Sequence, residues 1–296
     1  MDRPAALDLS KPPFHVDEGK DARSVAADFI ACFQAVSNLP DKVSACLQAA
    51  LDVAGCAKDD PLCMAGRRIA LDMDAGVGAG GENPYHNAQH FCEVLLSALY
   101  LSLLAGVAPK GKVELLIAAL AHDFHHDGRT NVNAPFRLER LSAEAASPYL
   151  ETAGVPLEER ARITAMIFAT EVTLGTRFAR DCHLHFSGDG PLPSISGVPG
   201  PLATLAGDAG LALQAVIVGE ADVLSSAGLT VQYGELQQEK LAEEWQQPLG
   251  ADHKLRFLDQ VFQGFTVGRF FSPNLRDLRS AAKDRADRER GPGSSR

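Results

Sequence analysis

The sequence predicts an all-α fold. From Asp21 onward apolar residues recur every three or four positions, Ala and Leu dominate, and the alternation of β-branched residues that marks strands is nearly absent. Helix start signals agree, such as Pro40-Asp41 and the Pro156 that precedes Leu157 and two glutamates. Helices are therefore expected at about 21–37, 40–56, 60–74, 88–106, 110–124, 137–152, 156–174, 208–226, 229–246 and 252–271.

Breaks in this pattern divide the chain. Residues 1–20 carry prolines and acidic residues without the apolar centre of a secretory signal, so a flexible N-terminus is expected. Residues 21–83 form an N-terminal helical cap that ends in a glycine-rich linker, which lacks the Gly-Lys-Ser/Thr ending of a phosphate-binding loop. A compact multi-helix domain follows over 84–280, with a Gly- and Pro-rich irregular stretch at about 183–206. The charged tail 281–296 is expected to be disordered.

Composition excludes several classes of protein. The net charge of −10 argues against a general nucleic-acid surface. The longest apolar run, Val94 to Ala108, is shorter than the roughly 18–20 residues that span a bilayer, so no membrane segment and a cytoplasmic location are expected. The six cysteines show no metal-binding spacing and are interpreted as buried thiols; a Cys56–Cys63 crosslink is the less favoured alternative.

Two short segments gather five of the nine histidines around a His-Asp pair. In the first, His86 and His90 are four residues apart, so both imidazoles share one face if the helix begins near His86. In the second, His122-Asp123 ends a very apolar helix and His126 follows, which places ligands at the rim of a rigid element. This joint spacing predicts a metal site.

A further ligand must come from a distant helix. Asp222 interrupts an apolar helix, where a lone carboxylate is costly unless it is paired or binds metal. Glu220 competes for this role but lies on a different face of the helix. His125, His183 and His185 are interpreted as ordinary structural or solvated residues.

The chain resembles the HD superfamily of metal-dependent phosphohydrolases, and within it the class I cyclic nucleotide phosphodiesterase catalytic domain. The resemblance covers about residues 84–271 and rests on four motifs in the same order as in that family. They are Tyr85-His86-Asn87-x-x-His90-x-x-x-Val94, His122-Asp123-x-x-His126-x-Gly128-x-x-Asn131, Ala169-Thr170-Glu171-Val172 and Ala221-Asp222-Val223-Leu224-Ser225.

The resemblance implies two divalent metal ions. The tight ion, zinc or else iron or manganese, would be bound by His90, His122, Asp123 and Asp222. Asp123 would bridge to a second ion, magnesium or manganese, held largely by waters, and imidazole-rich ligation does suit the softer of the two ions. A hydroxide between the metals would attack phosphorus.

The same resemblance assigns the remaining roles. His86 would protonate the leaving alkoxide, and His126 would contact the phosphate or the hydroxide. Glu171, with Glu144 as a further candidate, would orient imidazoles. Asn131 is expected among the substrate-binding residues.

The substrate end of the site departs from the family pattern. The purine-recognising glutamine of the family falls on Lys254, followed at the family's spacing by Phe257 as the aromatic clamp on the base. Lysine donates hydrogen bonds but accepts none, so purine-edge recognition cannot be inherited. A solvated Lys254, with the helix aligned one turn off, remains the alternative.

The sequence therefore predicts a two-metal phosphohydrolase that cleaves a phosphodiester bond, with a 3′,5′-cyclic nucleotide or a related cyclic nucleotide as substrate. Two alternatives stay open: an HD-type nucleotide phosphomonoesterase, and a non-enzymatic nucleotide- or protein-binding module with a structural metal site. The expected partner is a small-molecule nucleotide or other phosphodiester, and a homodimer stays open.

Overall fold

The computed structural model describes residues 14, 19–78, 83–131, 134–262 and 265–290, and within these ranges all regular structure is helical. This confirms the predicted all-α class. The N-terminal part comprises α1 (Ala22–Ser37), α2 (Lys42–Ala54) and α3 (Pro61–Asp74). The middle comprises α4 (Ala88–Leu104), α5 (Pro109–Ala121), α6 (Arg137–Thr152), α7 (Leu157–Phe168) and α8 (Gly175–Phe186). The C-terminal part comprises α9 (Gly200–Ala203), η2 (Thr204–Gly207), α10 (Ala209–Ala227), α11 (Val231–Glu244), α12 (Ala251–Phe262), η3 (Gly268–Phe271) and α13 (Ser272–Arg290).

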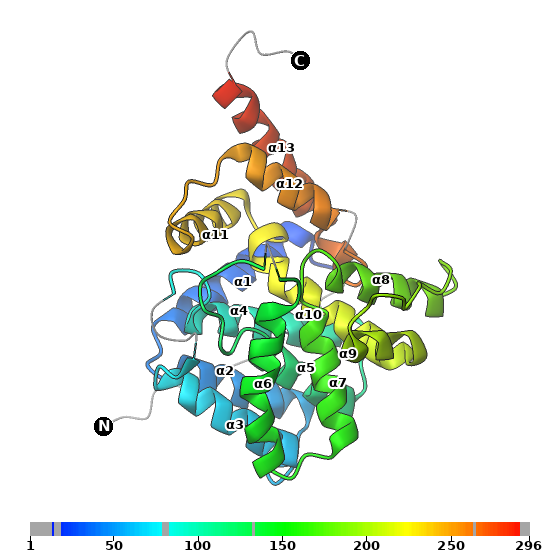
Figure 1. Cartoon of the computed structure of the whole chain (residues 1–296). Coiled ribbons are helices and arrows are strands. Elements are labelled where there is room, and N and C mark those ends of the chain that lie inside the picture. Colours follow the sequence, from blue (N-terminus) through cyan, green and yellow to red (C-terminus); the bar gives the residue numbers. More distant parts are fainter. Residues whose placement is uncertain (1–13, 15–18, 79–82, 132–133, 263–264, 291–296) are drawn as a thin grey trace.

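Helix α10 passes through the middle of the body (Figure 1) and packs against α4, α5, α7, α8 and α11. Helices α4 and α5 are buried almost all round, which agrees with their nearly continuous apolar sequences. Among the described helices, α10 is the one long and apolar enough to cross a membrane, and 72% of its apolar window is buried inside the fold. Its composition is therefore explained by its place in the core.

The N-terminal helices share this core. Helix α2 packs on α4 and α5, and α3 packs on α5 and α6. The ring of Phe29 in α1 lies 5.3 Å from that of Tyr100 in α4 and 6.2 Å from that of Phe271. Phe14 is buried and lies 6.0 Å from Phe29, although it falls in the segment 1–20 that was expected to be flexible. Most of that segment, and residues 79–82 of the linker, lie outside the described residues.

The expected helix 156–174 is interrupted. Helix α7 ends at Phe168, and a turn leads into α8, which the sequence pattern did not predict. In this turn Glu171 Oε2 accepts the backbone N–H groups of residues 173, 174 and 175 and so caps the start of α8. A Cβ on Gly175 would lie 2.4 Å from the carbonyl oxygen of Phe168, so only glycine allows the two helices to approach this closely.

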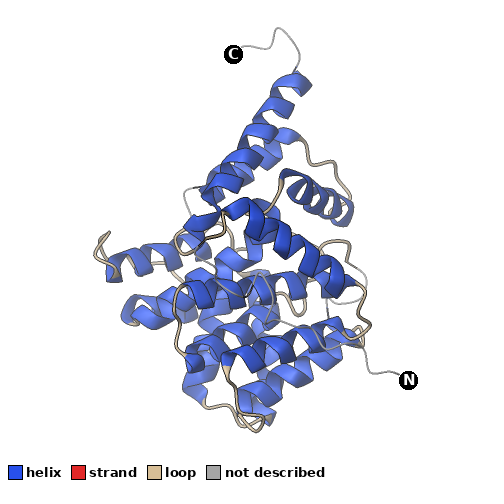
Figure 2. Ribbon diagram, turned by 180° about the vertical axis from the view of Figure 1, so that it is seen from behind, coloured by secondary structure: helices blue, strands red, loops and turns tan. Residues whose placement is uncertain are grey.

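The C-terminal region differs most from expectation. The predicted helix 252–271 ends at Phe262, and α13 continues to Arg290, so the expected disorder from residue 281 is wrong as far as 290. Helices α12 and α13 lie together and project from the body (Figures 1 and 2). The charged composition of α13 conceals a buried stripe at three- and four-residue spacing, formed by Leu275, Leu278, Ala282 and Ala286.

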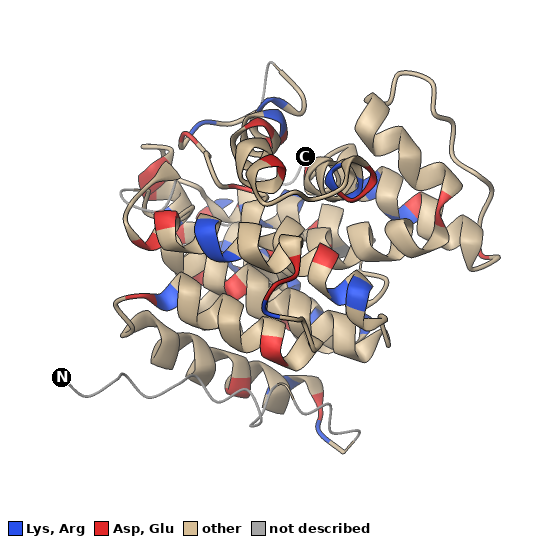
Figure 3. Ribbon diagram, turned by 90° about the horizontal axis from the view of Figure 1, so that it is seen from below, with Lys and Arg blue, Asp and Glu red and all other residues tan. Residues whose placement is uncertain are grey.

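Two further features depart from expectation. Cys56, in the connection that follows α2, forms a disulfide with Cys63 in the first turn of α3, so the interpretation of all six cysteines as thiols is wrong for this pair. The stretch 183–206 is partly helical, because α8 extends to Phe186 and residues 200–207 form α9 and η2. Acidic and basic residues are interspersed over the side of the molecule seen in Figure 3.

Candidate metal and phosphate site

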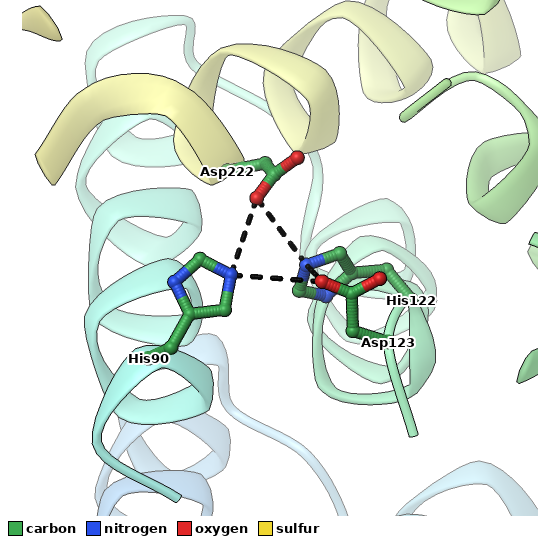
Figure 4. Close-up of side chains that lie close together, drawn as sticks. All are labelled: His90, His122, Asp123 and Asp222. Carbon is green, nitrogen blue, oxygen red and sulfur yellow. Dashed lines mark ion pairs between the residues drawn. The ribbon is translucent and has the colours of Figure 1, made fainter. Parts of the chain in front are cut away.

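Four predicted ligands from three helices meet at one point (Figure 4). His90 lies in the first turn of α4, because the side chain of Asn87 caps that helix by accepting the N–H groups of residues 89 and 90. His122 and Asp123 directly follow the last residue of α5, and Asp222 faces them from the C-terminal half of α10. One ligand atom from each residue lies within 4.8 Å of the other three.

The separations inside this cluster are short and even. Asp222 Oδ1 lies 3.3 Å from His90 Nε2 and 3.4 Å from His122 Nε2. Asp123 Oδ2 lies 3.1 Å from His122 Nε2 and 3.7 Å from His90 Nε2. Both Nε2 atoms are buried without a hydrogen-bond partner. Buried polar atoms rarely stay unsatisfied, which points to a ligand between these side chains.

Neighbouring groups set the tautomer of His122 and the protonation of His90. His122 Nδ1 donates to the carbonyl oxygen of Ala119 at 2.7 Å, so Nε2 is the nitrogen that faces the cluster and can bind a cation once it has lost its proton. Burial alone would lower the pKa of His90, but the carboxylates of Asp123 and Asp222 outweigh it and raise this pKa to about 9. A cation entering the cluster must therefore displace protons, so its affinity should rise with pH.

His86 lies just before α4 rather than inside it, since the helix begins at Ala88. Its Nδ1 donates to Glu244 Oε1 at 2.5 Å, while Oε2 of Glu244 accepts the backbone N–H groups of Tyr85 and His86 at 2.9 Å each. His86 Nε2 lies 3.8 Å from Asp123 Oδ2, beside the cluster. The buried carboxylate thus fixes one nitrogen of His86 and turns the other toward the proposed reaction centre.

His126 stacks on His86, with ring centroids 3.6 Å apart and an angle of 17° between the rings. Its Nδ1 accepts the N–H of Gly128 at 3.1 Å, so the neutral ring carries its proton on Nε2. Burial, together with the neighbouring His86, lowers the pKa of His126 to about 4. His126 is therefore a neutral hydrogen-bond donor near pH 7. Ligand atoms of His86, His126 and Glu244 also lie close together, but hydrogen bonds within the protein already use them.

A cleft of about 1120 Å³ opens beside the cluster and is lined by all three predicted substrate residues. The side-chain amide of Asn131 donates to the carboxylate of Glu139 through Nδ2 and accepts the backbone N–H of Leu138 through Oδ1. Phe257 is half-buried on the wall of the cleft. Lys254 is buried, and its ammonium donates to backbone carbonyls; the solvated alternative for this residue is therefore wrong.

Glu171, predicted to orient imidazoles, also lines the cleft, but the partners of its Oε2 are the backbone N–H groups of α8 described above. Glu144 is exposed on α6, and Glu139, more than one turn earlier, reaches the cleft instead. Burial, with Asp123 nearby, raises the pKa of Glu139 to about 7.

Sequence reasoning also missed Glu244. This residue is 158 positions from His86, in a mostly polar helix whose glutamates look interchangeable. Its neighbour Glu243 is exposed, whereas the side chain of Glu244 is 2% exposed. Only the packing of α11 against the start of α4 distinguishes the two.

Comparison with known proteins supports the fold. No family model and no curated protein matches the sequence. The phosphodiesterase domain of the RhoPDE fusion protein from the choanoflagellate Salpingoeca rosetta is similar in structure, with a TM-score of 0.58 and 16% identity over 92% of this chain and 94% of that one. A second structure, of the phosphodiesterase domain of the S. rosetta rhodopsin phosphodiesterase, gives a TM-score of 0.60 and 15% identity over 95% and 94%. The structure of LmjPDEB1 in complex with IBMX is similar as well, with a TM-score of 0.59 and 14% sequence identity. The match covers 96% of this chain and 94% of that one. Over nearly its whole length, the chain has the fold of solved phosphodiesterase domains.

Proposed function

We propose that the protein is a metal-dependent phosphohydrolase that cleaves a phosphodiester bond, with 3′,5′-cyclic nucleotides as the expected substrate class. The observation that carries the proposal is the buried cluster of His90, His122, Asp123 and Asp222. Its place in a phosphodiesterase fold, beside a cleft that can hold a nucleotide, supports the reaction class.

The cluster fits a transition metal ion. A tetrahedral ion with bonds of about 2.0–2.2 Å needs ligand atoms about 3.3–3.6 Å apart. The four measured separations between imidazole nitrogens and carboxylate oxygens run from 3.1 to 3.7 Å. A second divalent ion would be held by Asp123, which borders the cleft. When bound, such ions supply an activated water and neutralise the charge that develops on phosphate.

Side chains of the protein would supply the remaining roles, which are proton transfer to the leaving group, contact with the phosphate and contact with the base. His86 is placed to deliver a proton from Nε2 to the leaving oxygen, while Glu244 holds its Nδ1. His126, neutral and protonated on Nε2, donates a hydrogen bond to the phosphate. Aromatic contact with the base falls to Phe257 on the wall of the cleft.

Metal analysis and hydrolysis assays test this proposal together. The purified protein should contain a transition metal, and with added Mn²⁺ or Mg²⁺ it should hydrolyse cyclic nucleotides and bis-p-nitrophenyl phosphate. Asp123→Ala should lose turnover and occupancy of the second site. His125→Ala is the matched control, since this exposed histidine lies in the same segment but outside the cluster.

Two results would contradict the proposal. One is full activity in Asp123→Ala, and the other is unchanged metal content in a combined His90→Ala/His122→Ala protein. Open-chain nucleotide monophosphates belong in the same assay, because turnover of these alone would identify a phosphomonoesterase instead.

A further inference from the structure

Helix α12 presents one face to the cleft. His253, Arg256, Phe257 and Gln260 line it at spacings of three, four and seven residues, which place them on one side of a helix. The stem of Lys254 also borders the cleft, but this residue shares a buried side of α12 with Ala251 and Leu258.

The ammonium of Lys254 is already used. It donates to the carbonyl oxygen of Ser226 at 2.9 Å and to that of Gly234 at 3.0 Å, at the end of α10 and in α11. Only 8% of the residue is exposed. Lys254 therefore holds α12 against α10 and α11, and a substrate could recruit its ammonium only by breaking both of these buried hydrogen bonds.

The glutamines of the cleft are also committed. Gln237 donates to Glu93 at 3.0 Å, Gln238 donates to the carbonyl oxygen of Leu249, and Gln260 donates to that of Val172. Gln247 lies in the connection between α11 and α12, and its backbone N–H donates to the carbonyl oxygen of Ala242. Its side-chain amide has no hydrogen-bond partner among the described residues, so it is the one glutamine amide of the cleft still available to a ligand.

Arg256 is different from these residues. Its guanidinium is exposed on the cleft wall and forms no ion pair or hydrogen bond within the described parts of the chain. Phe257 follows it directly and lines the same cleft, so a ring stacked on Phe257 can present its edge to Arg256. In a protein of net charge −10, an unpaired guanidinium in the cleft that also borders Asp123 and Asp222 suggests an external acceptor.

We propose that Arg256 selects the substrate, and that it requires a pair of hydrogen-bond acceptors outside the scissile phosphodiester. The inference rests on the proposed function and names the substrate class of that same site. A guanidinium presents only donors in a planar fork. The N7/O6 edge of guanine matches this fork, whereas adenine places an amino donor against it. A second phosphate group offers the same acceptor pair.

Steady-state kinetics on the metal-loaded protein tests the choice. Wild-type kcat/KM should favour cyclic GMP, or cyclic di-AMP as the substrate with a second phosphate, over cyclic AMP by roughly 5- to 150-fold. Arg256→Gln should remove this preference, and Arg256→Lys should keep part of it. Arg276→Gln on the exposed side of α13 is the matched control and should leave both ratios unchanged. If Arg256→Gln changes the ratio of kcat/KM between cyclic GMP and cyclic AMP, the acceptor is guanine. If it changes the ratio between cyclic di-AMP and cyclic AMP, the acceptor is the second phosphate.

Binding measured by calorimetry separates this inference from the proposed function. The probes are GMP, AMP and adenosine 3′,5′-bisphosphate, added to wild-type, Arg256→Gln and Gln247→Ala proteins. If preference for GMP or the bisphosphate depends on Arg256 while no phosphodiester is hydrolysed, the proposed function fails and the inference stands. If Arg256→Gln leaves every ratio unchanged, if Gln247→Ala alone abolishes the preference, or if the wild type shows none, the inference is overturned.

Discussion

Replacing Glu244 by glutamine should disable His86 without disturbing the metal site. The carboxylate accepts three N–H groups, two from the backbone and one from His86 Nδ1. An amide of the same shape can satisfy the backbone pair with its oxygen, but its NH₂ group then faces the proton on Nδ1. The doubly protonated imidazole that a general acid requires is thereby disfavoured, because its Nδ1–H meets another donor.

The magnitudes follow from these contacts. Loss of general acid catalysis is typically worth 10²–10⁴ in rate, so kcat/KM for cyclic nucleotides should fall by about that factor. Loss of one hydrogen bond to a charged group should lower the free energy of unfolding by about 1.5–3 kcal/mol. Bis-p-nitrophenyl phosphate has a leaving group that needs little protonation, so its rate should fall by less than about tenfold.

The assay compares both substrates in wild type, Glu244→Gln and the exposed control Glu243→Gln, with metal content measured in each. An equal loss on both substrates would show that Glu244 only supports the fold. An unchanged rate on cyclic nucleotides in Glu244→Gln would refute the assignment of His86 as the acid.

Three further predictions concern positions that hold the fold together. Asn87→Ala removes the cap of α4 and should cost about 1 kcal/mol in urea unfolding, with weaker metal retention because His90 loses its fixed turn. Gly175→Ala brings a Cβ to 2.4 Å from a backbone carbonyl oxygen and should lower stability by about 1–3 kcal/mol, whereas Gly200→Ala, with nothing within 4 Å, should be nearly neutral. Burial lowers the pKa of Lys254 from 10.5 to about 8. Between these two pH values the unfolded chain binds more protons at this residue than the folded chain, so the free energy of unfolding should increase as the pH rises. Lys254→Met should remove this increase, which unfolding curves recorded from about pH 7.5 to 10.5 would measure.

The sequence determined the parts of this protein that depend on local pattern. Periodic apolar residues gave the core helices, including α6 at its observed bounds and α10 within one residue at each end. The spacing of the histidine motifs, read with the family resemblance, singled out the four residues that the structure brings together. A metal-binding side chain in the core is a polar residue inside an apolar helix or at its end, where an unpaired polar group would be costly. Asp222 and His122 are therefore conspicuous in the sequence itself.

Tertiary structure decided what depends on distant contacts. Glu244 and Glu243 are chemically identical in the sequence, and only the packing of α11 buries one of them against His86. Helix α13 has too few apolar residues to predict its own order and gains stability by packing on α12 and α1. The sequence pattern placed Lys254 at the position of the family's purine-recognising glutamine, but in the structure its ammonium donates to backbone carbonyls of two other helices. Sequence spacing fixes which face of a helix a residue occupies, whereas the direction in which that face points is set by neighbours far away in the chain.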